Sequence, residues 1–280
     1  MPELPEVETV RRGLQERFVG RRIDRVEVGR ERTVRRTSRE ALIDGLTGAT
    51  AIAANRHGKY LILPLDTGDS LMIHLRMSGR VLVDAVDTPR LDHTHVVLQL
   101  DGAPSEELRF VDPRTFGEVV VFDPANASVE MPELTRLGVD PIAHDLDRAT
   151  LKRLMLSRAR QLKALLLDQA VIAGIGNIYA DEIMHAARVR PDRISNTLTP
   201  AEITRLHTAI GEILRAAIAA GGSTLKDAQY VDIGGEGGWF QVSHRVYDRA
   251  GERCMTCGKA TIQRVPFAGR STHFCPRCQR

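Results

Sequence analysis

The feature that most restricts the fold of this chain is a pair of Cys-x-x-Cys motifs near its C-terminal end. Cys254 and Cys257 are separated by a 17-residue spacer from Cys275 and Cys278. Two such motifs at this distance can close a tetrahedral site of four thiolates around one Zn²⁺ ion, and four protein ligands leave no position for a catalytic water. The spacing therefore predicts a structural zinc hairpin. A redox-active dithiol pair and free thiols are the alternative interpretations.

Positive charge is concentrated in the same part of the chain. The formal net charge of all 280 residues is +3, but residues 245–280 contain eight Lys or Arg against two acidic residues, which gives this segment +6. A concentrated basic patch on a near-neutral protein is typical of polyanion binding, although a solubilising tail has the same composition.

Two further observations bear on the compartment. No apolar run approaches the roughly 18 residues that a membrane span needs, and the opening residues 1–13 carry early glutamates in place of an apolar signal core. We therefore expect a cytoplasmic protein associated with the nucleoid. In that compartment cysteines bind metal more often than they form disulfides.

Periodicity divides the chain into a β-rich half and a helical half. A first helix begins near Pro5, and short apolar runs between turn signals then extend from about residue 22 to 122. This spacing predicts an antiparallel sandwich or barrel. Beyond a Pro-, Asn- and Asp-rich loop the pattern becomes helical at 151–156, 162–167 and 178–187. The clearest helix has a Thr199–Glu202 capping box with Pro200 at its first position, and it closes at Gly221–Gly222.

These patterns predict an α+β multi-domain protein. Its parts are an N-terminal antiparallel β-sandwich with flanking helices, a helical domain, a glycine-rich loop and a zinc hairpin, at 1–130, 131–222, 223–243 and 244–280. Arg270 lies near the tip of the hairpin, where a rigid turn can present it to a DNA groove. By itself the hairpin indicates nucleic-acid binding but does not indicate which reaction, if any, the protein catalyses.

Five sequence blocks resemble those of bacterial formamidopyrimidine-DNA glycosylases. They occur in the order of that family and spread over nearly the whole chain. They are MPELPEVE at 1–8, HLRMSG at 74–79, DPRTFG at 112–117, GIGNIYADE at 174–182 and the four-cysteine hairpin. The related endonuclease VIII branch usually opens with Pro-Glu-Gly-Pro-Glu. Leu4 replaces that glycine here, which favours the branch that acts on oxidised purines.

The resemblance implies a bifunctional DNA glycosylase and abasic-site lyase of base excision repair. It would act as a monomer on damaged duplex DNA, excising 8-oxoguanine and formamidopyrimidines and nicking the strand by β,δ-elimination. The resemblance also implies one structural Zn²⁺, a helix–two-turns–helix motif in the helical domain and a lesion-recognition loop at 223–243. An endonuclease VIII-like enzyme for oxidised pyrimidines is one alternative. A catalytically silent zinc-hairpin DNA-binding protein is another, and the intact Pro2–Glu3 start counts against it.

The resemblance assigns catalysis to Pro2, Glu3, Lys59 and Arg270. Pro2, once Met1 is removed, would be the nucleophile, because a secondary amine with a pKa near ~8 is partly neutral at pH 7 and can attack a sugar carbon. Glu3 would act as general acid, Lys59 would stand by the scissile phosphate, and Arg270 would bind phosphate and assist the δ step. Without the resemblance, Pro2 and Glu3 are ordinary helix-start residues and Lys59 is a solvated lysine.

DNA binding is assigned to a second set of residues. An enzyme that attacks C1′ must turn the nucleotide out of the stack, and side chains must fill the space that it leaves. Met77, Arg114 and Phe116 match those fillers, and the nearby turn glycines favour exposure of Met77 and Phe116 over burial in a core. The expected DNA backbone contacts are His74, His93, Lys163 and Asn177. Two departures from the family pattern, Ala228–Gln229 and Trp239, leave the lesion preference open.

Overall fold

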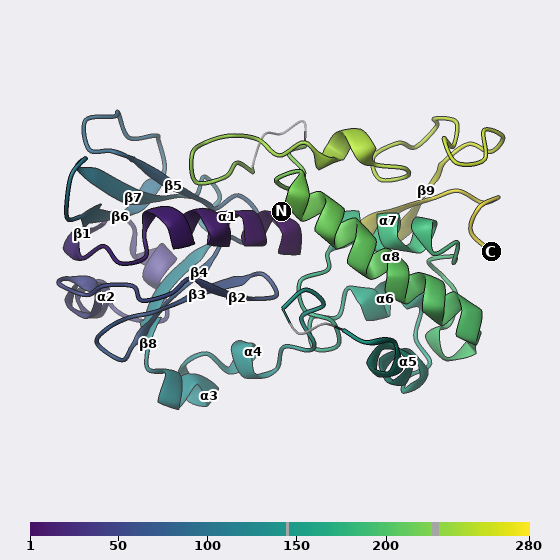
Figure 1. The fold of residues 1–280 in the computed structure, drawn as a ribbon, viewed down its shortest axis with the longest axis horizontal. Helices are drawn as coiled ribbons and strands as arrows, with labels where there is room; N and C mark the ends of the chain where they lie inside the picture. Colours follow the sequence, from purple (N-terminus) through teal and green to yellow (C-terminus); the bar gives the residue numbers. More distant parts are fainter. Residues whose placement is uncertain (144–145, 226–229) are drawn as a thin grey trace. The chain divides into compact units, whose positions relative to one another are not determined.

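The computed structural model describes residues 1–143, 146–225 and 230–280 (Figure 1). The chain divides into two compact units, residues 1–136 with 220–239 and residues 137–219 with 240–280. The segment that the sequence marks as a separate glycine-rich loop thus belongs to the first unit up to residue 239. Within the described residues, no helix is long and apolar enough to cross a membrane.

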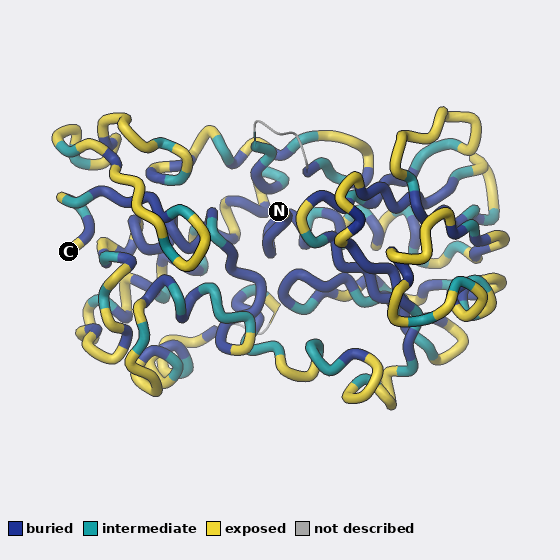
Figure 2. Tube along the Cα trace, turned by 180° about the vertical axis from the view of Figure 1, so that it is seen from behind, coloured by how far each residue is buried: buried dark blue, intermediate teal, exposed yellow. Residues whose placement is uncertain are grey.

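Two four-stranded antiparallel sheets form the first unit and confirm the predicted β-sandwich. Most strand positions are buried, and β4 is buried along its whole length, whereas the connecting loops are largely exposed (Figure 2). The strand order in one sheet is β1 (Ile23–Val28), β6 (Thr94–Leu100), β7 (Glu106–Val111) and β5 (Arg80–Ala85). The order in the other sheet is β2 (Asn55–His57), β3 (Tyr60–Pro64), β4 (Ser70–His74) and β8 (Glu118–Phe122).

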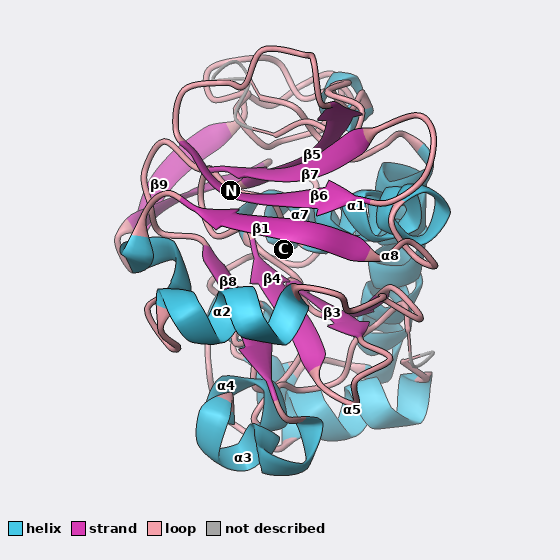
Figure 3. Cartoon of the chain, turned by 90° about the vertical axis from the view of Figure 1, so that its left-hand side faces the viewer, coloured by secondary structure: helices cyan, strands magenta, loops and turns pink. Residues whose placement is uncertain are grey.

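Two helices complete the core of this unit. Helix α1 (Leu4–Arg17) buries Val7, Val10 and Leu14 among the aliphatic side chains of the strands. Helix α2 (Arg39–Leu46) contacts β1 of one sheet and β8 of the other, so it covers the open side of the sandwich (Figure 3). The short elements of the unit are η1 (Glu31–Val34), η2 (Pro124–Asn126), α3 (Ala127–Glu130) and α4 (Pro132–Thr135).

The second unit is helical and ends in a hairpin. In the predicted capping box, the Thr199 N–H donates to Glu202 Oε2 at 2.7 Å. The helix that this box begins, α8 (Pro200–Ala219), is followed by Gly221 and Gly222 at φ +71° and +83°, values that favour glycine. The elements are α5 (Arg148–Leu156), α6 (Leu162–Leu166), α7 (Asn177–Ala186), η3 (Ser195–Thr197), α8 (Pro200–Ala219), η4 (Phe240–Ser243), β9 (Gln263–Phe267) and β10 (Arg270–Phe274).

Candidate active site and nucleic-acid interface

Pro2 and Glu3 form a buried start to helix α1. Met1 is 45% exposed, whereas Pro2 and Glu3 are both buried, and Glu3 is the N-cap residue. The Glu3 N–H donates to Glu6 Oε2 at 2.8 Å, a reciprocal contact of the kind that fixes the first helical turn. The backbone that carries the expected nucleophile and acid is therefore held in one conformation.

Glu6 also ties a distant loop to this helix. Its second oxygen accepts the N–H of Ser223 at 2.7 Å, although the two residues are 217 positions apart. Gly222 lies against the same carboxylate, and a Cβ atom there would approach Glu6 Oε1 to 2.8 Å. The segment that begins the expected lesion-recognition loop is thus anchored on α1.

The far end of that loop returns to its beginning. The Trp239 N–H donates to the Ala220 carbonyl at 2.9 Å, and the Tyr230 hydroxyl donates to the Gly221 carbonyl at 3.0 Å. Trp239 itself is 71% exposed. The expected insertion at Ala228–Gln229 lies outside the described residues.

A buried ion pair positions the turn that carries Lys59. The Arg56 Nε atom lies 3.0 Å from Glu8 Oε2 on helix α1, and Arg56 Nη1 donates to the Gly58 carbonyl at 3.0 Å. Burial alone would raise the pKa of Glu8, but hydrogen bonds from Arg11 and Arg56 outweigh it and hold the pKa below its usual value. Lys59 follows Gly58 directly and is itself 7% exposed.

His74 lies on the neighbouring strand and is held neutral. It pairs with Tyr60 across β3 and β4, and the two rings meet edge-on at 4.2 Å between centroids. Burial lowers the pKa of His74 to about 3. The Arg76 N–H donates to His74 Nδ1 at 3.0 Å, so the single ring proton of the neutral form is on Nε2. His74 can therefore donate to a phosphate without carrying charge.

Met77, Arg114 and Phe116 come together on two adjoining loops. Asp112 joins these loops, because its Oδ1 accepts both the Ser78 hydroxyl and the Arg114 N–H, while its Oδ2 accepts the Gly117 N–H at 2.7 Å. Met77 Sδ lies 3.6 Å from Arg114 Nη1. Met77 and Phe116 are each 42% exposed, as the neighbouring glycines led us to expect.

His93 belongs to the same supporting network. Its carbonyl accepts the Asp112 N–H at 3.0 Å, and its φ of +66° turns the chain in the left-handed region. The side chain is exposed and lies tilted over His95, with 6.3 Å between ring centroids. The backbone of the expected phosphate contact is thus bonded to the loop of Arg114 and Phe116.

Sequence reasoning missed a cluster of arginines beside Met77. Arg35, Arg36 and Arg76 all bind the buried carboxylate of Glu118. Burial works to raise the pKa of Glu118, but hydrogen bonds from Arg36 and Arg76 lower it below the usual value. Arg36 also pairs with Glu133, so three guanidinium groups face two carboxylates and leave one surplus positive charge. Arg35 and Arg76 remain more than a third exposed. The Arg35–Arg36 pair was the available signal in the sequence.

In the second unit, Asn177 contacts the hairpin one residue beyond Arg270. The turn before Arg270 contains Ala268 and Gly269, both at positive φ, and Arg270 is exposed at the beginning of β10. Asn177 is the first residue of α7, and its Nδ2 donates to the Ser271 carbonyl at 3.0 Å. The helix start expected to bind phosphate is therefore bonded to the strand that carries Arg270.

Lys163, which the resemblance assigns to the DNA backbone, lies in a buried network of protein contacts. Its side chain is fully buried, and its ammonium contacts Asp181 Oδ1 at 2.7 Å, Thr272 Oγ1 at 2.8 Å and the Ser271 carbonyl at 3.0 Å. An ammonium has three N–H donors, and three protein acceptors engage them. No local sequence pattern indicates this pairing, because Asp181 is 18 residues from Lys163 along the chain.

The four cysteines converge as the spacing predicted. All four Sγ atoms lie within 4.8 Å of one another, and the Cys254–Cys278 and Cys257–Cys275 pairs are each 3.8 Å apart. Tetrahedral Zn–S bonds of about 2.3 Å require nearly this separation. The donor set therefore fits one structural Zn²⁺, and His185 Nε2 lies 3.9 Å from Cys254 Sγ, where a neutral ring can support the thiolate.

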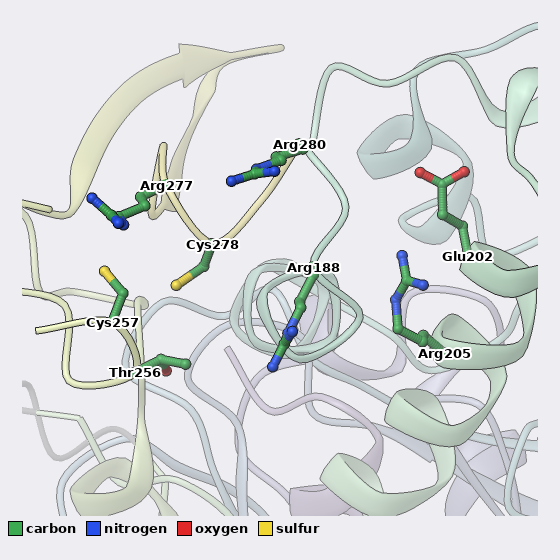
Figure 4. Close-up of a pocket in the computed structure, with 8 residues that line it drawn as sticks. All are labelled: Arg188, Glu202, Arg205, Thr256, Cys257, Arg277, Cys278 and Arg280. Atoms are coloured by element: carbon green, nitrogen blue, oxygen red, sulfur yellow. The ribbon is translucent and has the colours of Figure 1, made fainter. Parts of the chain in front are cut away.

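Two further features hold and surround this cluster. The Glu182 carboxylate of α7 accepts three successive N–H groups, from Arg245 to Tyr247, at 2.8 to 2.9 Å. Figure 4 shows Arg188, Arg277 and Arg280 around the Cys257 and Cys278 thiols, in a cleft of about 530 Å³. Four thiolates on Zn²⁺ carry a net charge of about −2, and these guanidinium groups offset it.

Family models match most of the chain. Residues 1–119 match the formamidopyrimidine-DNA glycosylase N-terminal domain, and residues 137–229 match the formamidopyrimidine-DNA glycosylase H2TH domain. Residues 251–280 match a zinc finger found in FPG and IleRS. The three matches follow the order of the five blocks identified in the sequence.

Individual relatives match over the full length. A formamidopyrimidine-DNA glycosylase of Desulfitobacterium hafniense is 42% identical, with all of both chains covered, and one of a Nocardioides species is 44% identical over all of this chain and 94% of its own. Among solved structures, a Lactococcus lactis FPG mutant in complex with Fapy-dG-containing DNA is 37% identical with a TM-score of 0.90, covering 100% of both chains. The same bacterium's Fpg with abasic-site DNA gives a TM-score of 0.88 over 99% of each chain. The chain therefore belongs to the formamidopyrimidine-DNA glycosylase family.

Proposed function

We propose that this chain removes oxidised purines from duplex DNA through a Schiff base on Pro2 and then nicks the strand by β,δ-elimination. Family membership assigns it a DNA glycosylase activity. The observation that carries the assignment of Pro2 is the buried, capped start of α1, in which Glu3 and Glu6 fix the backbone next to the nucleophile. We further propose that it works as a monomer on the nucleoid.

Removal of Met1 frees the secondary amine of Pro2. Its nitrogen attacks C1′, the bond from C1′ to the base breaks, and the base leaves with a proton. Transfer of a further proton to the ring oxygen opens the sugar and gives an iminium ion. Glu3 is the proposed donor of these protons, because its carboxyl group is buried directly next to Pro2 in the chain.

The iminium ion then drives strand cleavage. It acidifies the C2′ proton, and loss of that proton breaks the bond from C3′ to oxygen and releases the 3′ phosphate. In the δ step, loss of the C4′ proton breaks the bond from C5′ to oxygen, and water hydrolyses the imine. Lys59 and the neutral Nε2–H of His74 would stabilise phosphate charge, and Arg270 would assist the δ step.

The exposed loops supply what base eversion requires. Met77 and Phe116 offer apolar surface, and Arg114 offers a planar guanidinium group with several donors for the unpaired base. Arg35, Arg36 and Arg76 would neutralise backbone phosphates, and the side chains of His93 and Asn177 would contact the backbone through hydrogen bonds. The Lactococcus lactis complexes with Fapy-dG and abasic-site DNA support this class of substrate for a chain of the same family.

Borohydride trapping tests the proposal. The wild-type protein with Met1 removed should form a covalent complex with duplex DNA that contains 8-oxoguanine, and peptide mass spectrometry should place the sugar fragment on the N-terminal Pro2 peptide. N-terminally acetylated protein is the matched control, because its amide nitrogen cannot attack. Equal trapping by the acetylated protein, or an adduct on a lysine such as Lys59, would overturn the assignment. Faster excision of oxidised pyrimidines than of 8-oxoguanine would overturn the substrate assignment alone.

A further inference from the structure

Lys163 stands out in the second unit because its charged side chain is buried out of contact with solvent. Its side chain and that of Asp181 are both 0% exposed, and their Nζ and Oδ1 atoms are 2.7 Å apart. The ammonium also lies 5.7 Å from the centroid of the Phe267 ring, on the other strand of the hairpin. Burying both ions is costly unless every donor and acceptor is satisfied, so such a network is expected to hold one fixed arrangement.

The network converges on the three residues that follow Arg270. Lys163 donates to the Ser271 carbonyl and to Thr272 Oγ1. The other oxygen of Asp181 accepts the His273 N–H at 2.8 Å and lies 3.2 Å from the His273 ring nitrogen. Asn177 donates to the same Ser271 carbonyl. Helices α6 and α7 thereby fix consecutive residues of β10.

Strand β9 is more exposed than β10. Its first four residues are exposed and only Phe267 is partly buried, whereas Thr272, His273 and Phe274 of β10 are buried. Arg270 lies at the exposed end of β10, next to a turn with two residues at positive φ. The place of its Cα is therefore set through β10.

We infer that Lys163 is a positioning residue for Arg270 and binds no phosphate itself. The inference rests on the proposed function, because it assigns to Arg270 the phosphate contact of the δ step. A displacement of about 1 Å in a catalytic group can cost about 10²-fold in rate. Loss of the Lys163 ammonium therefore impairs the step that uses Arg270 and spares the attack by Pro2.

The first test is the salt dependence of binding to a duplex with a tetrahydrofuran abasic-site analogue. Each lost phosphate contact lowers the slope of log K against log salt by about 0.9. We expect Arg270→Ala to lower the magnitude of this slope by about 0.9, and Lys163→Met added to Arg270→Ala to lower it no further. A further decrease of about 0.9 in the double variant would show a direct phosphate contact of Lys163 and overturn the inference.

The second test follows the products of a single turnover on 8-oxoguanine DNA. Lys163→Met should lower the ratio of δ to β product at least about tenfold while the yield of borohydride trapping stays near that of wild type. An unchanged ratio would overturn the inference. Should Lys163→Met destabilise the chain by leaving the Asp181 carboxylate unpaired, the double variant Lys163→Met with Asp181→Asn decides the question, since the asparagine amide keeps an acceptor for the His273 N–H. Absence of trapping by wild type would instead refute the proposed function.

Discussion

His74 illustrates how single residues near the expected phosphate contacts are adjusted by their neighbours. The ring is buried against Tyr60, and the Arg76 N–H fixes which nitrogen carries the proton. A charged ring at this position would attract phosphate more strongly, but it would have to be desolvated beside Arg76 and Lys59, which both lower the pKa of His74. The structure therefore provides a neutral donor, and its cost is a stability that depends on pH.

That dependence is the first prediction at the residue scale. The pKa of His74 is about 3 in the folded chain and about 6.5 in the unfolded chain. Below pH 6.5 the unfolded chain therefore takes up a proton that the folded chain does not, and the unfolding free energy decreases as the pH falls toward 3. Between pH 7 and pH 5 the wild type should lose about 2 kcal/mol more than His74→Asn, which keeps an acceptor for the Arg76 N–H. Urea unfolding at both pH values measures this difference, and equal losses would contradict it.

At the element scale, the two loops that carry Met77 and Phe116 pack on one aromatic ring. A Cβ atom on Gly117 would lie 2.5 Å from Phe110 Cζ, and one on Gly79 would lie 3.0 Å from the same atom. Glycine at both positions lets the loops approach β7 closely, and Asp112 then joins them by hydrogen bonds. The positions of Met77 and Phe116 thus depend on the packing beneath them.

Gly117→Ala tests this dependence. Because the added methyl group overlaps the Phe110 ring, the variant should lose about 1 to 3 kcal/mol of unfolding free energy and bind lesion DNA more weakly. Placing Gly117→Ala in a Phe110→Leu background removes the overlap, so the two changes should couple by at least about 0.5 kcal/mol in a double-mutant cycle. Denaturant unfolding of the four proteins provides the cycle. Additive losses would mean that the glycine is there for another reason.

Sequence and structure agree best where a pattern is local. Strands β1 to β8 all lie in the predicted β-rich segment, and the helix that begins after Thr199 begins where its capping box placed it. Helix α2 was missed, because its eight residues are too short to show a helical period. The motifs pointed to Pro2, Arg114 and the cysteines as candidates, but not to the long-range contacts around them, since Glu6 accepts the Ser223 N–H from 217 residues away. The buried network of Lys163 was missed for the same reason.

At the scale of the whole molecule, the β-sandwich and the zinc hairpin are stabilised in different ways. The first has a continuous core of aliphatic side chains drawn from α1 and both sheets. Around the cysteines, by contrast, the buried cluster is small: Val246, Cys254, Ile262 and Cys275. The burial of so few apolar residues cannot offset the conformational entropy lost by about 40 ordered residues. Metal binding and the hydrogen bonds to Glu182 and Asp181 must therefore supply the remaining stabilisation.

Zinc removal should therefore act on the hairpin and leave the β-sandwich folded. Structural Zn²⁺ contributes about 10 to 16 kcal/mol to the folding of zinc-finger peptides, so chelation should unfold the hairpin and displace Arg270. We expect affinity for lesion DNA to fall at least about tenfold, because even 1.4 kcal/mol of lost contact has that effect. The thermal transition of the β-sandwich should persist, since its core contains no cysteine.

Calorimetry with and without chelator measures both transitions. The Cys257→Ser variant should reproduce the effect without chelator, with no recovery on adding zinc. Loss of both transitions together would show that the sandwich depends on the metal, and unchanged DNA affinity would show that the hairpin does not need it.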